Sequence, residues 1–319
     1  MEIDHRVDPE LRELLELTPP TELNHDNLSA TRDMQAELTR QTNAQLPEIE
    51  GVSQEDRMVP GPAGDPDVRI RIYKPTEQTE PLPGFFWIHG GGYVLGDIDS
   101  NDYASKLWVK NVGCVIVSVD YRRAPEAPYP APLEDCYAAL EWMVTHADEL
   151  GIDQSRIAIG GASAGGGLAS GLALLVRDRA EMTVVAQLLM YPMINDKNVA
   201  PATDTLPDTH IWSRAKNLFG WTCYLGQEPG AEDIPIYAAA FRAEDLSGLP
   251  PALIVVGDLD LFLEENLDYA GRLIKAGVLT ELHVYPGAYH GFNGFSPGAA
   301  VSRQCNADYL QALTRALQK

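Results

Sequence analysis

The pattern of apolar positions divides the chain into two unequal parts. Between residues 8 and 46 leucines recur at helical spacing, as at Leu11, Leu14 and Leu15, and the pair Pro19 and Pro20 separates two predicted helices. After these helices the pattern changes to short apolar runs that alternate with further helical segments. The chain therefore predicts an amino-terminal helical segment followed by a domain of strands and helices.

Seven runs in the second part have the length and composition of strands. They cover residues 68–75, 85–89, 112–121, 156–161, 184–191, 251–257 and 281–287. The first alternates with a period of two, as a half-buried strand does, whereas the others are largely apolar. Apolar runs of this kind are typical of central parallel strands that are covered on both faces.

Helical patterns separate most of these strands. They lie near residues 101–111, 134–149, 164–179, 264–276 and 300–317. Strands alternating with helices predict an α/β fold with a mostly parallel sheet and right-handed crossovers. Residues 195–247 interrupt this order with a long segment that contains a predicted helix near 209–224, and such insertions are often lids or substrate-binding elements.

Charge and composition narrow the class of partner. The 319 residues carry a formal net charge of −22, which argues against nucleic acids and anionic membranes as partners. No run approaches the roughly 18 apolar residues of a membrane span, and the acidic amino terminus lacks the pattern of a secretory signal. The 4 cysteines show no paired spacing, and Cys114 lies in an apolar run. We therefore expect a cytoplasmic protein with free thiols and no bound metal.

The sharpest chemical signal is the pattern Gly161-x-Ser163-x-Gly165 at the junction of a predicted strand and a predicted helix. A sharp turn there lifts the serine oxygen above the sheet, and the glycines let neighbouring backbone approach closely. The helix start behind the serine adds backbone N–H groups that favour negative charge. A plain glycine-rich turn is the alternative, but the position favours a nucleophile.

A second signal is His89-Gly90-Gly91-Gly92, directly after a strand. Acyl transfer forms an oxyanion, which backbone N–H donors of such a loop can stabilise. We expect Gly90 and Gly91 to donate, with Ala164 as a third donor. The alternatives are a plain turn or a phosphate-binding loop, although no P-loop lysine follows.

A general base must accompany the serine, and His290 is the best candidate among the 7 histidines. It follows the last predicted strand in a glycine-flanked loop downstream of Ser163. The other histidines lie in or beside predicted helices, in the long insertion, within a strand or in the glycine loop: His5, His25, His146, His210, His283 and His89.

An acidic group is needed to orient the imidazole, and the loop after strand 251–257 offers Asp258, Asp260, Glu264 and Glu265. Spacing alone does not choose between Asp258 and Asp260, and one of these two is also suited to cap the following helix. The order serine, acid, histidine is that of α/β-hydrolases rather than of chymotrypsin-like or subtilisin-like proteases.

These segments resemble the hormone-sensitive-lipase-like family of carboxylesterases. The matching sequences are HGGGYVLGD, VDYRRAPEAPYPAPLEDCYAAL, GGASAGGGLA, DLDLFLEE and YPGAYHGF, in family order from about residue 50 onward. The resemblance implies the α/β-hydrolase fold and the triad Ser163, Asp260 and His290. The sequence departs from the family pattern at Ala162, where Asp or Thr is common, and at Leu261, where proline is common.

The resemblance also implies a cap over the site and a division into domains. Residues 1–48 would form cap helices, and residues 49–319 the hydrolase domain with a cap insertion at about 195–225. Trp212, Phe219 and Trp221 are candidates for the lining of the substrate pocket, with ordinary cap packing as the alternative. A homodimer is a further expectation.

The resulting hypothesis is a hydrolase of short to medium acyl esters that works through an acyl-enzyme without a cofactor and belongs to lipid metabolism. Its partner would be a small-molecule ester. An amidase, lactonase or carbamate hydrolase with the same triad is the first alternative. A ligand-binding protein of the same fold is the second, although receptors of that kind lack the catalytic histidine, and His290 is present.

Overall fold

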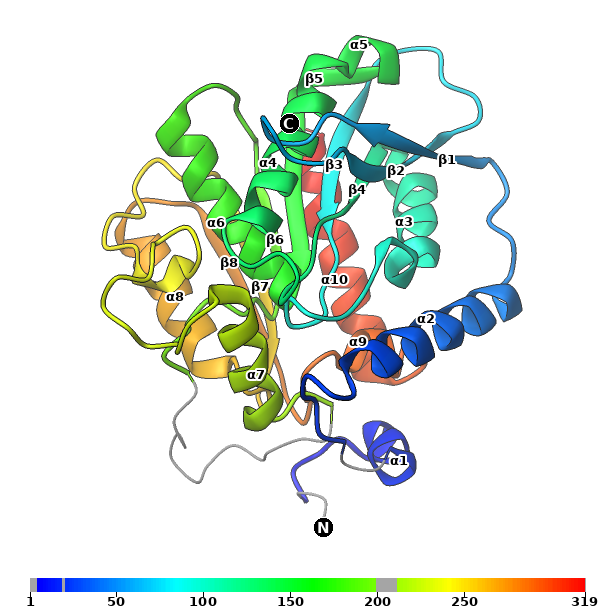
Figure 1. The fold of residues 1–319 in the computed structure, drawn as a ribbon. Coiled ribbons are helices and arrows are strands. Elements are labelled where there is room, and N and C mark those ends of the chain that lie inside the picture. Colours follow the sequence, from blue (N-terminus) through cyan, green and yellow to red (C-terminus); the bar gives the residue numbers. More distant parts are fainter. Residues whose placement is uncertain (1–4, 19–20, 199–210, 319) are drawn as a thin grey trace.

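The computed structural model describes residues 5–18, 21–198 and 211–318. Within these ranges the chain forms one sheet of eight strands with helices on both faces (Figure 1). The strands are β1 (Val52–Val59), β2 (Val68–Pro75), β3 (Leu82–Ile88), β4 (Val115–Asp120), β5 (Ile152–Ala162), β6 (Gln187–Met190), β7 (Ala252–Gly257) and β8 (Thr280–Tyr285). This arrangement confirms the predicted α/β fold with a mostly parallel sheet.

The strand order in the sheet is β1-β2-β4-β3-β5-β6-β7-β8. The pairs β1–β2 and β2–β4 are antiparallel, and every pair from β4–β3 to β7–β8 is parallel. All seven predicted strands are present, β2 with the predicted bounds and the other six with shifted ends. Strand β1 was not predicted, because its sequence VSQEDRMV is mostly polar and it lies exposed at the sheet edge.

One strand prediction was wrong in its placement. The run at 281–287 was expected to be a central strand covered on both faces, but β8 is the last strand of the sheet. Four of its residues are only partly buried and Val284 is exposed. An edge strand pairs on one side only, and its position depends on the topology rather than on its own composition.

The helices follow the predicted order. They are α1 (Pro9–Leu17), α2 (Leu28–Gln45), α3 (Asp102–Trp108), α4 (Ala131–Thr145), α5 (Ala147–Leu150), α6 (Ala164–Arg179), α7 (Arg214–Leu225), α8 (Leu263–Lys275), α9 (Phe292–Phe295) and α10 (Ala300–Leu317). Helices α6 and α10 have the predicted bounds. The helix predicted near 209–224 begins at Arg214. Residues 209 and 210 of this prediction, the second of which is His210, lie outside the described residues.

Alternate residues of the strands build two separate cores. In β3, Phe86 and Ile88 face the core that includes α4, α6 and α8, whereas Phe85 and Trp87 face the core that includes α1, α3 and α10. All four side chains are at most 1% exposed. Burial on both faces explains why the sequence of β3 is a continuous apolar run. The sheet is thus the middle of three layers (Figure 1).

Strand β2 is more deeply buried than its alternating pattern predicted. Arg71 is only 7% exposed, although it lies on the face opposite to Val68, Ile70 and Ile72. Its guanidinium donates to Asp56 of β1 and to Asp99, at 2.5 Å in each case, and it lies 3.3 Å from Asp102 of α3. These carboxylates compensate the positive charge, which is what allows an arginine to be buried here.

The topology brings two sequence-distant turns together. After β3 the chain crosses to β4 on one side and then returns to β5 on the other, so that β3 and β5 are neighbours and Ile88 pairs with Gly161. Ligands of open α/β sheets bind at the carboxyl ends of the strands near such a switch point. Strands β7 and β8 lie beyond β6 on the β5 side of the sheet. Their carboxyl ends are at the same edge as those of β3 and β5, and Asp260 and His290 follow these ends in the chain.

Candidate active site

Ser163 lies in the sharp turn between β5 and α6. Its φ of 57° and ψ of −120° place it in a region that non-glycine residues rarely adopt. Surrounding hydrogen bonds hold this conformation: the Ser163 N–H donates to the carbonyl of Met190, and its own carbonyl accepts the N–H groups of Gly167 and Met193. Strain of this kind persists only where the neighbouring structure fixes it, and it is common at functional sites.

The glycines on either side of the serine are required by close backbone contacts. A Cβ atom at Gly161 would lie 2.2 Å from the carbonyl oxygen of Gly165, and one at Gly165 would lie 2.2 Å from the carbonyl oxygen of Ile88. Both distances are far below van der Waals contact. The first turn of α6 is therefore packed directly against the end of β3, which places Ser163 beside the glycine loop.

The structure brings Ser163, His290 and Asp260 into one hydrogen-bonded row. The Nε2 atom of His290 lies 2.9 Å from Ser163 Oγ, and its Nδ1 atom lies 2.8 Å from Asp260 Oδ2. A carboxylate oxygen only accepts, so Nδ1–H donates to Asp260 and leaves Nε2 to accept from the serine hydroxyl. The three side chains are 7%, 5% and 0% exposed in that order. This arrangement can activate the serine oxygen as a nucleophile.

The His290 ring is also fixed from the sides. Tyr191 and Phe262 contact it edge-on, with ring centroids at 4.8 Å and 5.0 Å. The hydroxyl of Tyr191 in turn donates to Asn293 Oδ1 at 2.9 Å. These aromatic contacts restrict the imidazole to the orientation in which it meets both Ser163 and Asp260.

The two candidate acids have different partners. The second carboxylate oxygen of Asp260 accepts the N–H of Phe262 at 2.9 Å, so this residue also turns the chain into α8. Asp258 is partly buried and does not contact the imidazole; its Oδ1 accepts the backbone N–H of Gly287 at 2.6 Å. The geometry thus separates two residues that spacing alone left equivalent.

The glycine loop lies close to the serine. A Cβ atom at Gly90 would lie 3.4 Å from the Cβ of Ser163. In the described part of the chain, no hydrogen bond uses the backbone N–H of Gly90, Gly91 or Ala164. Ala164 is buried and Gly90 and Gly91 are partly buried, and their three N–H groups, without an acceptor among the described residues, form a set of donors suited to an oxyanion.

The side chain of His89 orients this loop, a role that the sequence pattern did not assign. Its Nδ1 lies 2.8 Å from the Gly90 carbonyl oxygen, and its ring stacks on Tyr121 with centroids 4.3 Å apart. Burial lowers the pKa of His89, so the neutral ring donates through Nδ1. Because C=O and N–H of a trans peptide point in opposite directions, this bond aims the Gly91 N–H away from His89. In the sequence, the position of His89 directly before the three glycines is the feature that could have indicated this role.

Helices α2 and α7 lie near the carboxyl edge of the sheet (Figure 1). His25, ahead of α2, meets Phe219 of α7 edge-on at 5.1 Å. Trp212 packs on the glycine loop so closely that a Cβ atom at Gly92 would lie 1.9 Å from its ring. Trp221 is fully buried beside Tyr93, which favours packing over pocket lining for this residue.

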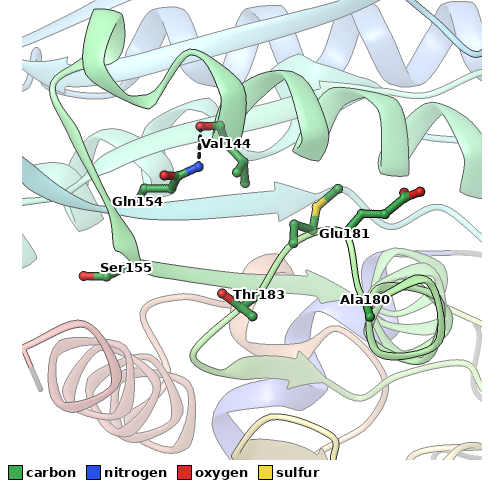
Figure 2. A pocket seen from close by; sticks show the side chains of 7 residues that line it. Val144, Gln154, Ser155, Ala180, Glu181 and Thr183 are labelled. Atoms are coloured by element: carbon green, nitrogen blue, oxygen red, sulfur yellow. Dashed lines mark hydrogen bonds between the residues drawn. The ribbon is translucent and has the colours of Figure 1, made fainter.

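A separate surface pocket lies at the opposite edge of the sheet from this site. It is lined by Val144, Gln154, Ser155, Ala180, Glu181, Met182 and Thr183 (Figure 2). Gln154 and Ser155 belong to the beginning of β5, whereas Ser163 follows its end. Because ligands of such sheets bind at the carboxyl ends of strands, this pocket is on the wrong edge for the chemistry of Ser163.

Other sequence-based predictions concern the cysteines, membrane spans, cellular location, metabolic role and oligomeric state. All four cysteines have free thiols and are buried, as predicted for Cys114. No helix within the described ranges is long and apolar enough to cross a membrane. The cytoplasmic location, the role in lipid metabolism and the homodimer stay predictions.

Comparison with known proteins identifies the family. Residues 85–294 match a protein family described by its alpha/beta hydrolase fold. The chain is 36% identical over 318 residues to the carboxylesterase NlhH of Mycobacterium tuberculosis, covering 98% of this chain and 96% of that protein. Among solved structures, a bacterial heroin esterase shares 40% identity with a TM-score of 0.93, covering 98% of this chain and 99% of that one. Esterase LipW of Mycobacterium marinum shares 35% identity with a TM-score of 0.88, covering 98% and 96%.

The chain therefore belongs to the α/β-hydrolase family. Within it, the resemblance to the hormone-sensitive-lipase-like carboxylesterases is confirmed, and the chain is a serine carboxylesterase.

Proposed function

We propose that this carboxylesterase cleaves short to medium acyl esters with Ser163, His290 and Asp260 as its catalytic triad. The observation that carries the proposal is the hydrogen-bonded row in which His290 lies 2.9 Å from Ser163 Oγ and 2.8 Å from Asp260 Oδ2. In the first step Ser163 Oγ attacks the ester carbonyl carbon while His290 Nε2 takes the hydroxyl proton. Asp260 stabilises the imidazolium that forms.

The tetrahedral intermediate then collapses, and His290 returns the proton to the leaving alcohol. This step breaks the carbon–oxygen bond of the ester and leaves the acyl group on Ser163. Water, activated by the same imidazole, releases the acid and restores the serine. The N–H groups of Gly90, Gly91 and Ala164 serve as the oxyanion hole, in which removing a single donor typically costs roughly 3–4 kcal/mol of transition-state stabilisation.

The domain assignment belongs to the same proposal. Residues 1–48 supply cap helices, the insertion at about 195–225 supplies the rest of the cap, and residues 49–319 otherwise form the hydrolase domain. The contact between His25 and Phe219 supports a cap built from both segments. The closeness of Trp212 to Gly92 supports a small enclosed acyl site, which favours short to medium chains over long ones.

The test is a series of nitrophenyl esters from acetate to palmitate, with Ser163→Ala and Ser155→Ala as matched variants. We expect the highest kcat/KM on the shorter esters and a loss of roughly three or more orders of magnitude in kcat for Ser163→Ala. Organophosphate labelling should be lost in the same variant. Ser155, which is exposed at the other end of the same strand, should be replaceable without effect.

Several results would contradict the proposal. Ester hydrolysis that persists in Ser163→Ala would remove Ser163 from the mechanism. A preference for palmitate would exclude the proposed chain length. Faster cleavage of matched amides than of esters would favour the amidase alternative.

A further inference from the structure

The loop that carries His290 is aligned with the loop that carries the triad acid by backbone hydrogen bonds. The Asp258 N–H donates to the carbonyl of Tyr285 at 3.0 Å, and the Leu259 N–H donates to the carbonyl of Ala288 at 3.0 Å. These bonds continue the pairing of β7 with β8 beyond the ends of both strands. The register of one loop thus determines the register of the other.

Gly287 is the residue of the histidine loop that is held most completely. Its N–H donates to the carboxylate Oδ1 of Asp258 at 2.6 Å. From the opposite direction its carbonyl accepts the N–H of Asp8, the residue directly before α1, at 3.0 Å. With a φ of +69° Gly287 turns the chain in a conformation that favours glycine. Two segments more than 200 residues apart in the chain therefore fix one turn.

Little space is available for this turn to shift. A Cβ atom at Gly257 would lie 2.0 Å from the carbonyl oxygen of Ala288, and one at Gly287 would lie 2.7 Å from the backbone nitrogen of Asp8. The hydroxyl of Tyr289 also donates to the carbonyl of Leu11 in α1, at 3.3 Å. The backbone leading to His290 is consequently enclosed by the acid loop on one side and by the amino-terminal segment on the other.

We propose that Asp258 is a positioning residue for His290: its carboxylate holds the turn at Gly287 and so sets the approach of the imidazole to Ser163. The inference rests on the proposed triad. Asp258 makes no bond to the imidazole, and the feature that matters is an acceptor oxygen at the right place rather than a negative charge. Reacting groups displaced by about 1 Å can lose up to roughly a hundredfold in rate, so loosening this turn should lower kcat.

Two conservative substitutions separate placement from charge. Asp258→Asn keeps an acceptor oxygen at the same distance from the backbone and removes the charge, whereas Asp258→Glu keeps the charge and moves the carboxylate by one methylene. Glu264→Ala is the matched control, because it removes an exposed acidic charge from the same region without touching the turn. Each variant is assayed for kcat, KM and the pH profile of kcat on a short nitrophenyl ester, alongside its thermal midpoint.

We expect Asp258→Asn and Glu264→Ala to keep kcat within about threefold of the unsubstituted protein and to keep its pH profile. Asp258→Glu should lower kcat by about tenfold or more with KM within about twofold, since substrate binding does not involve the turn. A loss of kcat in Asp258→Asn with retention in Asp258→Glu would overturn the inference in favour of a charge effect. Full activity in both variants would also overturn it.

The outcome for the triad itself is read independently. If the unsubstituted protein does not hydrolyse esters, or Ser163→Ala remains active, the proposed function fails. If those controls behave as expected and Asp258→Glu is fully active, only the positioning role fails.

Discussion

Ser163 Oγ and His290 Nε2 lie 2.9 Å apart although 127 residues separate them in the chain. Each side chain follows a strand of the same sheet, and the strand order places β5 and β8 on the same half of it. The imidazole then forms its second hydrogen bond with a carboxylate that is fully buried. A buried, aligned row of this kind needs little rearrangement before the first chemical step.

Asp260→Asn should reduce activity without unfolding the protein. An amide at position 260 no longer enforces the tautomer in which Nε2 accepts from Ser163, so we expect kcat to fall by roughly 10³- to 10⁴-fold. Steady-state kinetics measure the loss, and Asp258→Asn provides the comparison. Activity lower in Asp258→Asn than in Asp260→Asn would mean that the two acids have been assigned the wrong way round.

Gly165→Ala should prevent the nucleophile turn from forming. The added Cβ would lie 2.2 Å from the carbonyl oxygen of Ile88, a contact with backbone that cannot move without displacing β3. We expect a loss of soluble folded protein or of nearly all activity. Gly271→Ala is the matched control: nothing lies within 4 Å of that Cβ position in α8, so the helix should gain about 0.5–1 kcal/mol. Circular dichroism and thermal unfolding measure the folding and stability of both variants. A stable, active Gly165→Ala protein would contradict the prediction.

Arg71→Met should destabilise the sheet edge. The guanidinium is buried and hydrogen-bonded to Asp56 and Asp99, so its removal leaves the partly buried Asp99 without this cation, whereas the exposed Asp56 keeps its pair with Arg69. The expected loss in free energy of unfolding is about 1–3 kcal/mol, the range for lost hydrogen bonds to charged groups. Arg40→Met breaks an exposed pair with Glu37 and should change the stability much less, because solvent screens exposed ion pairs. Urea denaturation compares them, and equal effects would argue against a structural role for burial at Arg71.

Glu265 should make stability depend on pH. Its buried carboxylate accepts the N–H of Ile194 at 2.8 Å and the amide of Asn198 at 2.7 Å, yet burial dominates and raises its pKa to about 8. Between the ordinary value of 4.5 and about 8 the folded protein keeps a proton that the unfolded chain has released. The free energy of unfolding therefore falls as pH rises through this window.

Glu265→Gln cannot ionise and should lose this contribution to the pH dependence. Relative to the variant, the unsubstituted protein should lose up to roughly 1.4 kcal/mol of stability for each pH unit between about pH 5 and about pH 8. Urea denaturation of both proteins at several pH values measures the difference. Parallel stability curves would show that the carboxyl group does not hold its proton in the folded state.

The amino-acid sequence alone indicates the family and the chemistry of the site. Apolar runs and helical periods predict the order of elements, with the bounds of α6 correct to the residue. The glycines around Ser163 and the trio after His89 also carry their own signal, because close contacts at these positions leave no space for a side chain. The contacts reach across the fold, as between Gly165 and Ile88, but each requires glycine at its own position, so a local pattern records them.

Other features were decided only by the tertiary structure. The polar strand β1 and the exposed strand β8 owe their positions to the sheet order, and burial of Arg71 depends on acids from three other segments. The different partners of Asp258 and Asp260 are likewise invisible in their spacing. Each of these depends on contacts between residues far apart in the chain, and a side chain's own identity does not specify which distant segment will meet it.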